Sequence, residues 1–145
     1  MPTIIAILLS LVVLGAEAQP RGDLILFSSN DSNGVSVQYV VSKQRAEKVP
    51  LWEPLVAPPP LTLEQAATVG LAWLKAKHPD VTAFVLSGVS FREFPFRPAF
   101  AKRWYYQLDF EPIVGGKRLG GSGFATIILF DGSIVEPQPA APRRP

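Results

Sequence analysis

The sequence contains no cysteine and only one histidine among its 145 residues. Without cysteine the chain cannot form a disulfide, a thiolate nucleophile or a zinc-cysteine centre, and it offers no cysteine for lipid attachment. One histidine is too few for the usual ligand set of a transition metal. We therefore expect neither a cofactor nor a metal, and a core that forms without cross-links.

Charge is also scarce, because charged side chains make up 18% of the chain and the formal net charge is +2. The Lys and Arg residues are spread along the sequence, so the basic balance gives little support for nucleic-acid binding. Hydrophobic residues make up 48%, which is near the average for globular proteins, and the length fits one domain. The composition thus predicts one globular domain and no nucleic-acid partner.

Residues 1–18, MPTIIAILLSLVVLGAEA, have the pattern of a signal peptide, although no Lys or Arg precedes the apolar run. The run from Ile4 to Gly15 is shorter than the roughly 20 residues that a membrane-spanning helix needs, and Glu17 closes it. It ends in an A-x-A cleavage site at 16–18. We expect cleavage after Ala18, a periplasmic or secreted mature chain, and no stable membrane insertion. A retained anchor is the alternative.

Residues 19–48 are predicted to contain a β-hairpin. Apolar residues alternate with polar ones from Val35 to Val41, and Asn33-Gly34 supplies the positive φ of a tight turn. The expected partner strand is 24–28. Residues 49–60, VPLWEPLVAPPP, follow as a proline-rich segment that should be extended and mostly unpaired. Four apolar side chains favour a strap lying over the core rather than a free linker; they are Leu51, Trp52, Leu55 and Val56.

A helix is predicted to begin after Thr62, which has the capping-box spacing with Gln65, and to stop at His78-Pro79. Gly70 lies in the middle of its apolar face and indicates a close approach to whatever lies beneath. The residues of that face are Leu63, Ala66, Ala67, Gly70, Leu71, Trp73 and Leu74.

Strands are predicted after the helix at 84–94, 103–112 and 123–137, the last stretch containing a tight Asp131-Gly132 turn, and the short links make successive strands antiparallel neighbours. The fold class is therefore α+β, with one amphipathic helix across an antiparallel meander sheet. In the middle strand Trp104 and Tyr106 face one way and Tyr105 the other. Both sheet faces are apolar, so either the proline-rich strap or the N-terminal hairpin must cover the second face. Residues 138–145 show no periodicity and are expected to be a disordered tail.

The segment LTLEQAATVGLAWLKAKHP, the strands after it and the closing ATIILFDGSIVEP resemble the small PepSY domain of exported bacterial proteins. The resemblance covers residues 61–137, and the family's final apolar strand, Asp, Gly turn and apolar pair match Asp131, Gly132, Ile134 and Val135 in order. It implies a cystatin-like layout of a helix on an antiparallel sheet. It also implies a non-catalytic envelope module, of a kind proposed to restrain peptidases or to sense and bind partners.

The residues offer little support for catalysis. His78 occupies the last helical turn, where a cation suits the helix dipole, so a surface cap is expected rather than a general base. Ser122 lies in a glycine run that lacks the nucleophile-elbow and phosphate-loop spacings. Asp109 and Glu111 share a strand face, as charged residues on a solvent face routinely do. We therefore predict that the chain is not an enzyme.

The best candidate contact surface is the stretch 92–103, which carries four cations and one acid beside the aromatic strand. We predict that it meets an envelope or extracellular protein. The predicted contact residues are Arg92, Arg97, Lys102, Arg103 and Tyr105. The alternative is a small-ligand carrier or enzyme with a pocket between helix and sheet.

Overall fold

The structure is a computed structural model that describes residues 22–31, 33–95, 98–120 and 123–140. The predicted signal peptide, Arg97, Ser122 and residues 141–145 of the predicted tail lie outside the described residues.

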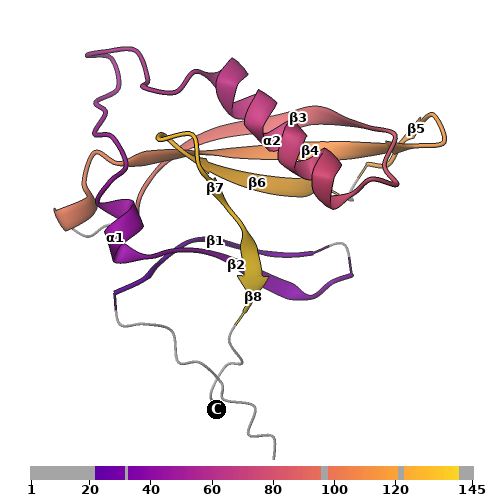
Figure 1. Cartoon of the computed structure of the whole chain (residues 1–145), viewed down its shortest axis with the longest axis horizontal. Coiled ribbons are helices and arrows are strands. Elements are labelled where there is room, and N and C mark those ends of the chain that lie inside the picture. The colour runs from indigo at the N-terminus through magenta and orange to yellow at the C-terminus, as the bar shows by residue number, and fades with distance from the viewer. Residues whose placement is uncertain (1–21, 32, 96–97, 121–122, 141–145) are drawn as a thin grey trace, which may run out of the picture.

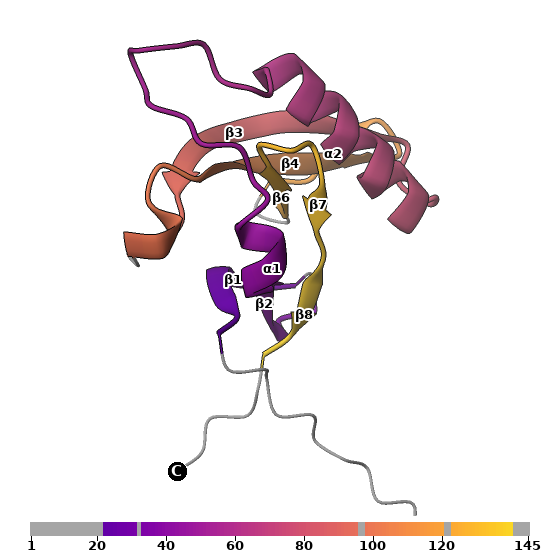
Figure 2. The ribbon, with the colours of Figure 1, turned by 60° about the vertical axis from the view of Figure 1, so that its left-hand side comes forward.

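The described chain has the predicted α+β class, with two antiparallel sheets and one main helix (Figures 1 and 2). The larger sheet has the order β3-β4-β6-β7, with β5 paired to β4, and the smaller has the order β1-β2-β8. The larger sheet contains β3 (Ala83–Glu93), β4 (Trp104–Val114), β5 (Lys117–Arg118), β6 (Phe124–Leu129) and β7 (Ile134–Val135). The smaller contains β1 (Leu24–Asn30), β2 (Ser36–Val41) and β8 (Pro137–Pro139). The helices are α1 (Lys43–Ala46), α2 (Leu63–Lys77) and the 3₁₀ turn η1 (Pro98–Phe100).

Helix α2 begins at the predicted capping box. Gln65 N donates to Thr62 Oγ1 at 3.2 Å, and Thr62 N donates to Gln65 Oε1 at 2.9 Å. These two bonds satisfy amides that the first helical turn leaves without partners. The buried side of the helix is narrower than predicted, because Leu63 is exposed while Ala66 and Leu74 are buried.

The close approach expected at Gly70 is confirmed. A Cβ built at this position would lie 3.1 Å from Thr126 Oγ1, 3.2 Å from Ile128 Cδ1 and 3.4 Å from Phe110 Cε2. The absence of a side chain therefore lets α2 rest directly on β4 and β6.

Strand β4 is buried on both faces, as the alternation of its residues requires. Tyr106 lies on the face that α2 and the strap cover, and its hydroxyl donates to Leu61 O at 2.8 Å. Tyr105 lies on the opposite face, where its hydroxyl donates to Leu26 O of β1 at 2.9 Å. Of the two predicted covers for the second face, the N-terminal hairpin is therefore the one that occupies it.

The proline-rich strap packs onto the core through Trp52. The centroid of the Trp52 ring lies 5.4 Å from that of Trp104 and 5.3 Å from that of Phe130. Its amide donates to Lys102 O at 2.8 Å. Val49, at the start of the strap, is also buried. The expectation that all four named apolar side chains lie over the core was wrong, because Leu51, Leu55 and Val56 are exposed.

The C-terminal prediction is also corrected. Within 123–137 the expected Asp131-Gly132 turn separates β6 from β7, but a further strand, β8, extends into the segment expected to be disordered. Gln138 pairs with Gln38, and Ala140 N donates to Ser36 O at 3.0 Å. Prolines suggested a tail, yet β8 is an edge strand, where a missing amide donor is tolerated. The chain thus passes from the larger sheet to the smaller one at Glu136, a crossover visible in Figure 2.

Replacing Gly70 by Val should lower the free energy of unfolding by about 1–3 kcal/mol, because the added carbons would overpack the contact with Thr126 and Ile128. The matched control is Ala72→Val on the exposed side of the same helix, which should cost only about 0.5 kcal/mol of helix propensity. Thermal or urea unfolding measures both. Equal losses in the two variants would contradict the close packing of α2.

Candidate binding surfaces

The predicted contact surface at 92–103 must be corrected at Tyr105. This side chain was expected to be exposed, but only 2% of it is accessible and its hydroxyl bonds to β1. Burial also raises the pKa of Tyr105. The alternation placed Tyr105 on the right face but could not reveal that the hairpin covers that face.

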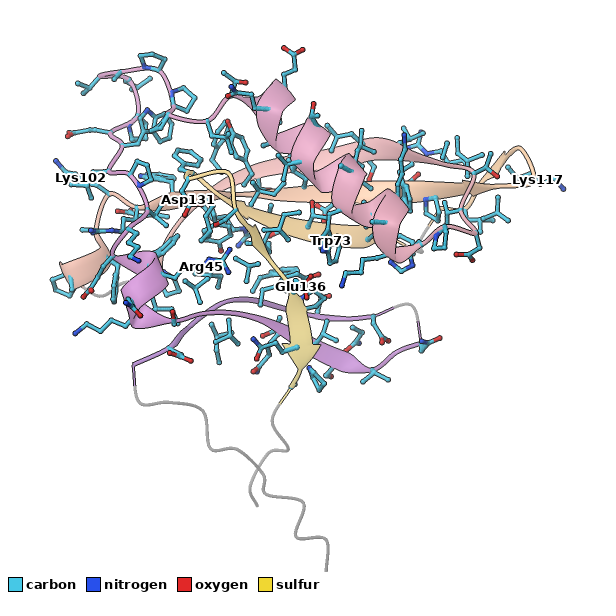
Figure 3. The ribbon with its side chains drawn as sticks, in the orientation of Figure 1. Arg45, Trp73, Lys102, Lys117, Asp131 and Glu136 are labelled. Carbon is cyan, nitrogen blue, oxygen red and sulfur yellow. The ribbon has the colours of Figure 1, made fainter. Side chains whose placement is uncertain are left out.

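Two of the predicted contact residues, Lys102 and Arg103, instead make contacts within the chain itself. Lys102 Nζ lies 2.7 Å from Glu53 Oε2 of the strap, and this pairing raises the pKa of Lys102 (Figure 3). The guanidinium of Arg103 donates to Ala99 O at 3.2 Å and to Glu47 O at 3.1 Å. Arg97 lies outside the described residues. The structure therefore does not assemble these cations into one free surface, and Arg92, exposed on β3, is the predicted contact residue that remains open.

The open edge of β3 lies beside Arg92. Strand β3 has 11 residues and pairs with β4 on one side, so it forms one edge of the larger sheet. Three apolar side chains along it are partly exposed: Leu86 by 36%, Val89 by 39% and Phe91 by 46%. Their partners in the register, Phe110, Leu108 and Tyr106, place all three on the α2 side of the sheet.

This apolar row is not uniform along the strand. Phe91 is partly embedded, since its ring centroid lies 4.7 Å from that of Tyr106 and 6.0 Å from that of Trp52. A bulge at Ser87 interrupts the pairing between Leu86 and Gly88, and Ser87 Oγ donates to Asp109 O at 3.0 Å. The regular part of the edge is therefore the segment 88–93, which includes Val89 and Phe91.

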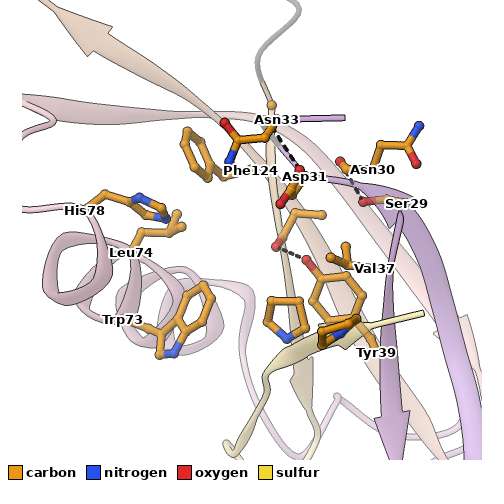
Figure 4. A pocket seen from close by; sticks show the side chains of 14 residues that line it. Ser29, Asn30, Asp31, Asn33, Val37, Tyr39, Trp73, Leu74, His78 and Phe124 are labelled. Atoms are coloured by element: carbon orange, nitrogen blue, oxygen red, sulfur yellow. Dashed lines mark hydrogen bonds between the residues drawn. The ribbon is translucent and has the colours of Figure 1, made fainter. Parts of the chain in front are cut away.

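A cleft of about 370 Å³ forms a second surface, between the C-terminal end of α2, the start of β6 and the smaller sheet (Figure 4). Trp73 lines it from the helix, and Trp73 Nε1 donates to Glu136 Oε1 at 3.2 Å. Lys77 Nζ lies 3.2 Å from the same oxygen. These two bonds lower the pKa of Glu136 and fasten the helix end to the β7–β8 crossover.

His78 combines the predicted cap with a packing role. Its amide donates to Leu74 O at 2.8 Å, so it closes α2 as expected. Its ring, however, is half-buried, with its centroid 4.5 Å from that of Phe124 and 6.3 Å from that of Phe84. Expecting a simple surface cap was therefore wrong, because sequence spacing gave no sign that β6 would bring Phe124 beneath it.

The far side of the cleft is held by Tyr39 of β2. Its hydroxyl donates to Ala125 O at 2.8 Å, which joins the smaller sheet to β6. Burial, helped by the nearby Asp109 carboxylate, raises the pKa of Tyr39 to about 12. At neutral pH Tyr39 is therefore a neutral donor.

The cleft differs from the pocket considered in the sequence. That pocket was placed between helix and sheet, where the contact at Gly70 leaves no room. The cleft instead lies beyond the helix end, and its lining comes from segments near residues 30, 38, 75, 124 and 138. The sequence assigned Trp73 to the apolar face of the helix, but no local pattern placed it near Tyr39. The cleft could therefore not be predicted from the sequence.

Comparison of the chain with protein-family models, characterised proteins and solved structures gives no match. Among the described residues, no helix has the length and apolar character needed to cross a bilayer.

The raised pKa of Tyr39 predicts a loss of stability in alkali. Its pKa is 10.0 without the fold's influence and about 12 in the folded state, so the unfolded chain loses this proton first. The contribution of Tyr39 to the free energy of unfolding is thus complete below pH 10 and is lost as the pH rises from 10 to 12. Tyr39→Phe should cost about 1 kcal/mol at neutral pH through the lost hydrogen bond, yet show a shallower alkaline decline. Urea unfolding across this pH range measures it, and parallel declines would refute the assignment.

Proposed function

We propose that this chain is an exported, non-catalytic binding module that accepts an extended segment of an envelope or extracellular protein along the edge of β3. The observation that carries the proposal is the open edge of this strand together with the exposed apolar row on it. The localisation rests on the signal-peptide pattern of residues 1–18.

An edge strand presents backbone N–H and C=O groups that a further strand can pair with, and alternate side chains supply the specificity. Proteins usually protect such edges with Lys, Pro, bulges or a covering segment. Strand β3 has a bulge at Ser87, but the segment 88–93 contains neither Lys nor Pro. The chemistry of the edge therefore fits an extended partner with apolar residues at alternate positions.

The expected partner should also carry a negative charge. Arg92 is exposed on β3, on the face opposite Val89 and Phe91, as its pairing with Tyr105 shows. An acidic side chain on the corresponding face of the partner would complement it. The PepSY-like resemblance supports the same reading, since that family implies restraint of peptidases or sensing rather than catalysis.

A photoreactive residue placed at Val89 in the exporting cell should cross-link an envelope protein, because Val89 is an exposed apolar residue of the open segment. The matched control is Val114, a similarly exposed valine at the end of β4, which should give no such adduct. A synthetic peptide copying the cross-linked segment should then bind the purified chain. Its affinity should fall at least about tenfold in Val89→Lys and stay unchanged in Val114→Lys.

The cross-linking and peptide-binding results distinguish a foreign protein, a second copy of this chain and no partner at the β3 edge. Adducts of equal strength at Val89 and Val114, or a peptide that binds Val89→Lys normally, would refute the β3 site. An adduct with a second copy of this chain would replace the proposed partner by a homodimer.

Export itself predicts a defined mature N-terminus. Cleavage after Ala18 removes Glu17 and leaves a chain that begins at Gln19. Intact-mass measurement of protein recovered from the periplasm or medium should give the mass of 19–145. Recovery of only the full-length chain in the membrane fraction would favour the retained anchor instead.

A further inference from the structure

We propose that the cleft at the end of α2 binds a small organic cation, an ammonium or guanidinium group carried on an apolar stem. This inference concerns a surface separate from the β3 edge. It rests on the rings that line the cleft, on the charges around it and on the way its walls are fixed.

Aromatic rings approach the cleft from both sides. Figure 4 shows Trp73 of α2 and the following cap residue His78 on one side, Tyr39 from β2 on the other, and Phe124 of β6 at one end. Trp and Tyr faces attract cations through the ring quadrupole, and aromatic-lined pockets of this kind bind quaternary ammonium groups. At about 370 Å³, the cleft falls within the volumes typical of small-ligand sites.

The charges around the cleft have the complementary sign. Among the described residues that line it there is neither Lys nor Arg, whereas Asp31 is one of them. The Asp109 carboxylate acts on Tyr39 and helps to raise the pKa of its phenol, so negative potential reaches that wall. Lys77 Nζ lies 5.8 Å from the centroid of the Trp73 ring, and its pairing with Glu136 offsets its charge. An anionic ligand would therefore find no cationic partner in the lining, while a cation would be attracted.

The carboxylate at the rim is held in place by the hairpin turn. Asp31 Oδ1 accepts hydrogen bonds from Asn33 N at 2.9 Å and from Val35 N at 2.8 Å. An Asn side chain has the same acceptor oxygen, so Asp31→Asn removes the charge and keeps the geometry. The opposite wall is equally fixed, since the bond from Trp73 to Glu136 sets the position of the indole.

The test is a nuclear magnetic resonance titration of the exported chain with benzyltrimethylammonium, followed through the indole N–H signals of its three Trp residues. The Trp73 signal should shift, with a dissociation constant of about 1 mM, while those of Trp52 and Trp104 stay in place. Benzyl alcohol and benzoate, which share the ring but lack the positive charge, should bind at least about tenfold more weakly.

Variants assign the effect to the cleft. Asp31→Asn should weaken binding about 3- to 10-fold, and added salt should weaken it in the unmodified chain. The matched control is Glu64→Gln, which removes an exposed acid from the other end of α2 and should leave the dissociation constant unchanged. Val89→Lys should also leave it unchanged, which separates this proposal from the β3 site.

A parallel titration with Nα-acetylarginine N-methylamide identifies the source of the cation. Binding of both probes at Trp73 indicates that a basic side chain of a peptide suffices, and binding of the quaternary amine alone indicates a free small amine. The proposal is overturned if benzoate or benzyl alcohol binds as well as the cation. Absence of any Trp73 shift at about 20 mM probe, well above the expected dissociation constant, overturns it too.

Discussion

The burial of strand β4 on both faces is the constraint on which the rest of this structure depends. Its residues alternate between two apolar faces, and each face needs a layer of its own. Helix α2 and Trp52 of the strap cover one face, and the sheet β1-β2-β8 covers the other. A central strand of this kind makes three layers necessary, and both candidate binding surfaces lie where those layers end.

The layers are joined by the short stretch from Ser133 to Glu136. Arg45 of α1 donates to Ser133 Oγ at 2.8 Å and to Ile134 O at 2.5 Å. The Glu136 carboxylate accepts a hydrogen bond from Trp73 of α2 (Figure 3) and forms an ion pair with Lys77 of the same helix. Both helices are therefore fastened to the segment where the chain changes sheets. These bonds lie at exposed or half-exposed positions, so they position the elements while the buried apolar contacts supply most of the stability.

Features that depend on neighbouring residues could be predicted from the sequence, whereas the segments that cover each face of the larger sheet could not. The Thr62–Gln65 cap and the positive φ at Gly34 and Gly132 depend on neighbouring residues, and all are present as expected. Strand alternation assigned Tyr105 to a face but carried no information on what lies above that face. Strand β8 was missed because two prolines disfavour a strand unless it is an edge strand. The cleft is assembled from distant segments, so only the folded chain reveals it.

The pairing of β2 with β8 has a consequence for the order in which the molecule closes and opens. Gln38 must find Gln138, and every strand of the larger sheet lies between them in the sequence. Such a contact carries a high loop-closure cost, so it forms after the local β1–β2 hairpin and the meander. In the folded protein β8 is correspondingly the strand that can detach without dismantling the larger sheet. The Gln138 amide, the one N–H that β8 carries between its two prolines, should exchange with solvent sooner than the amides of β4, and each opening would remove one wall of the cleft.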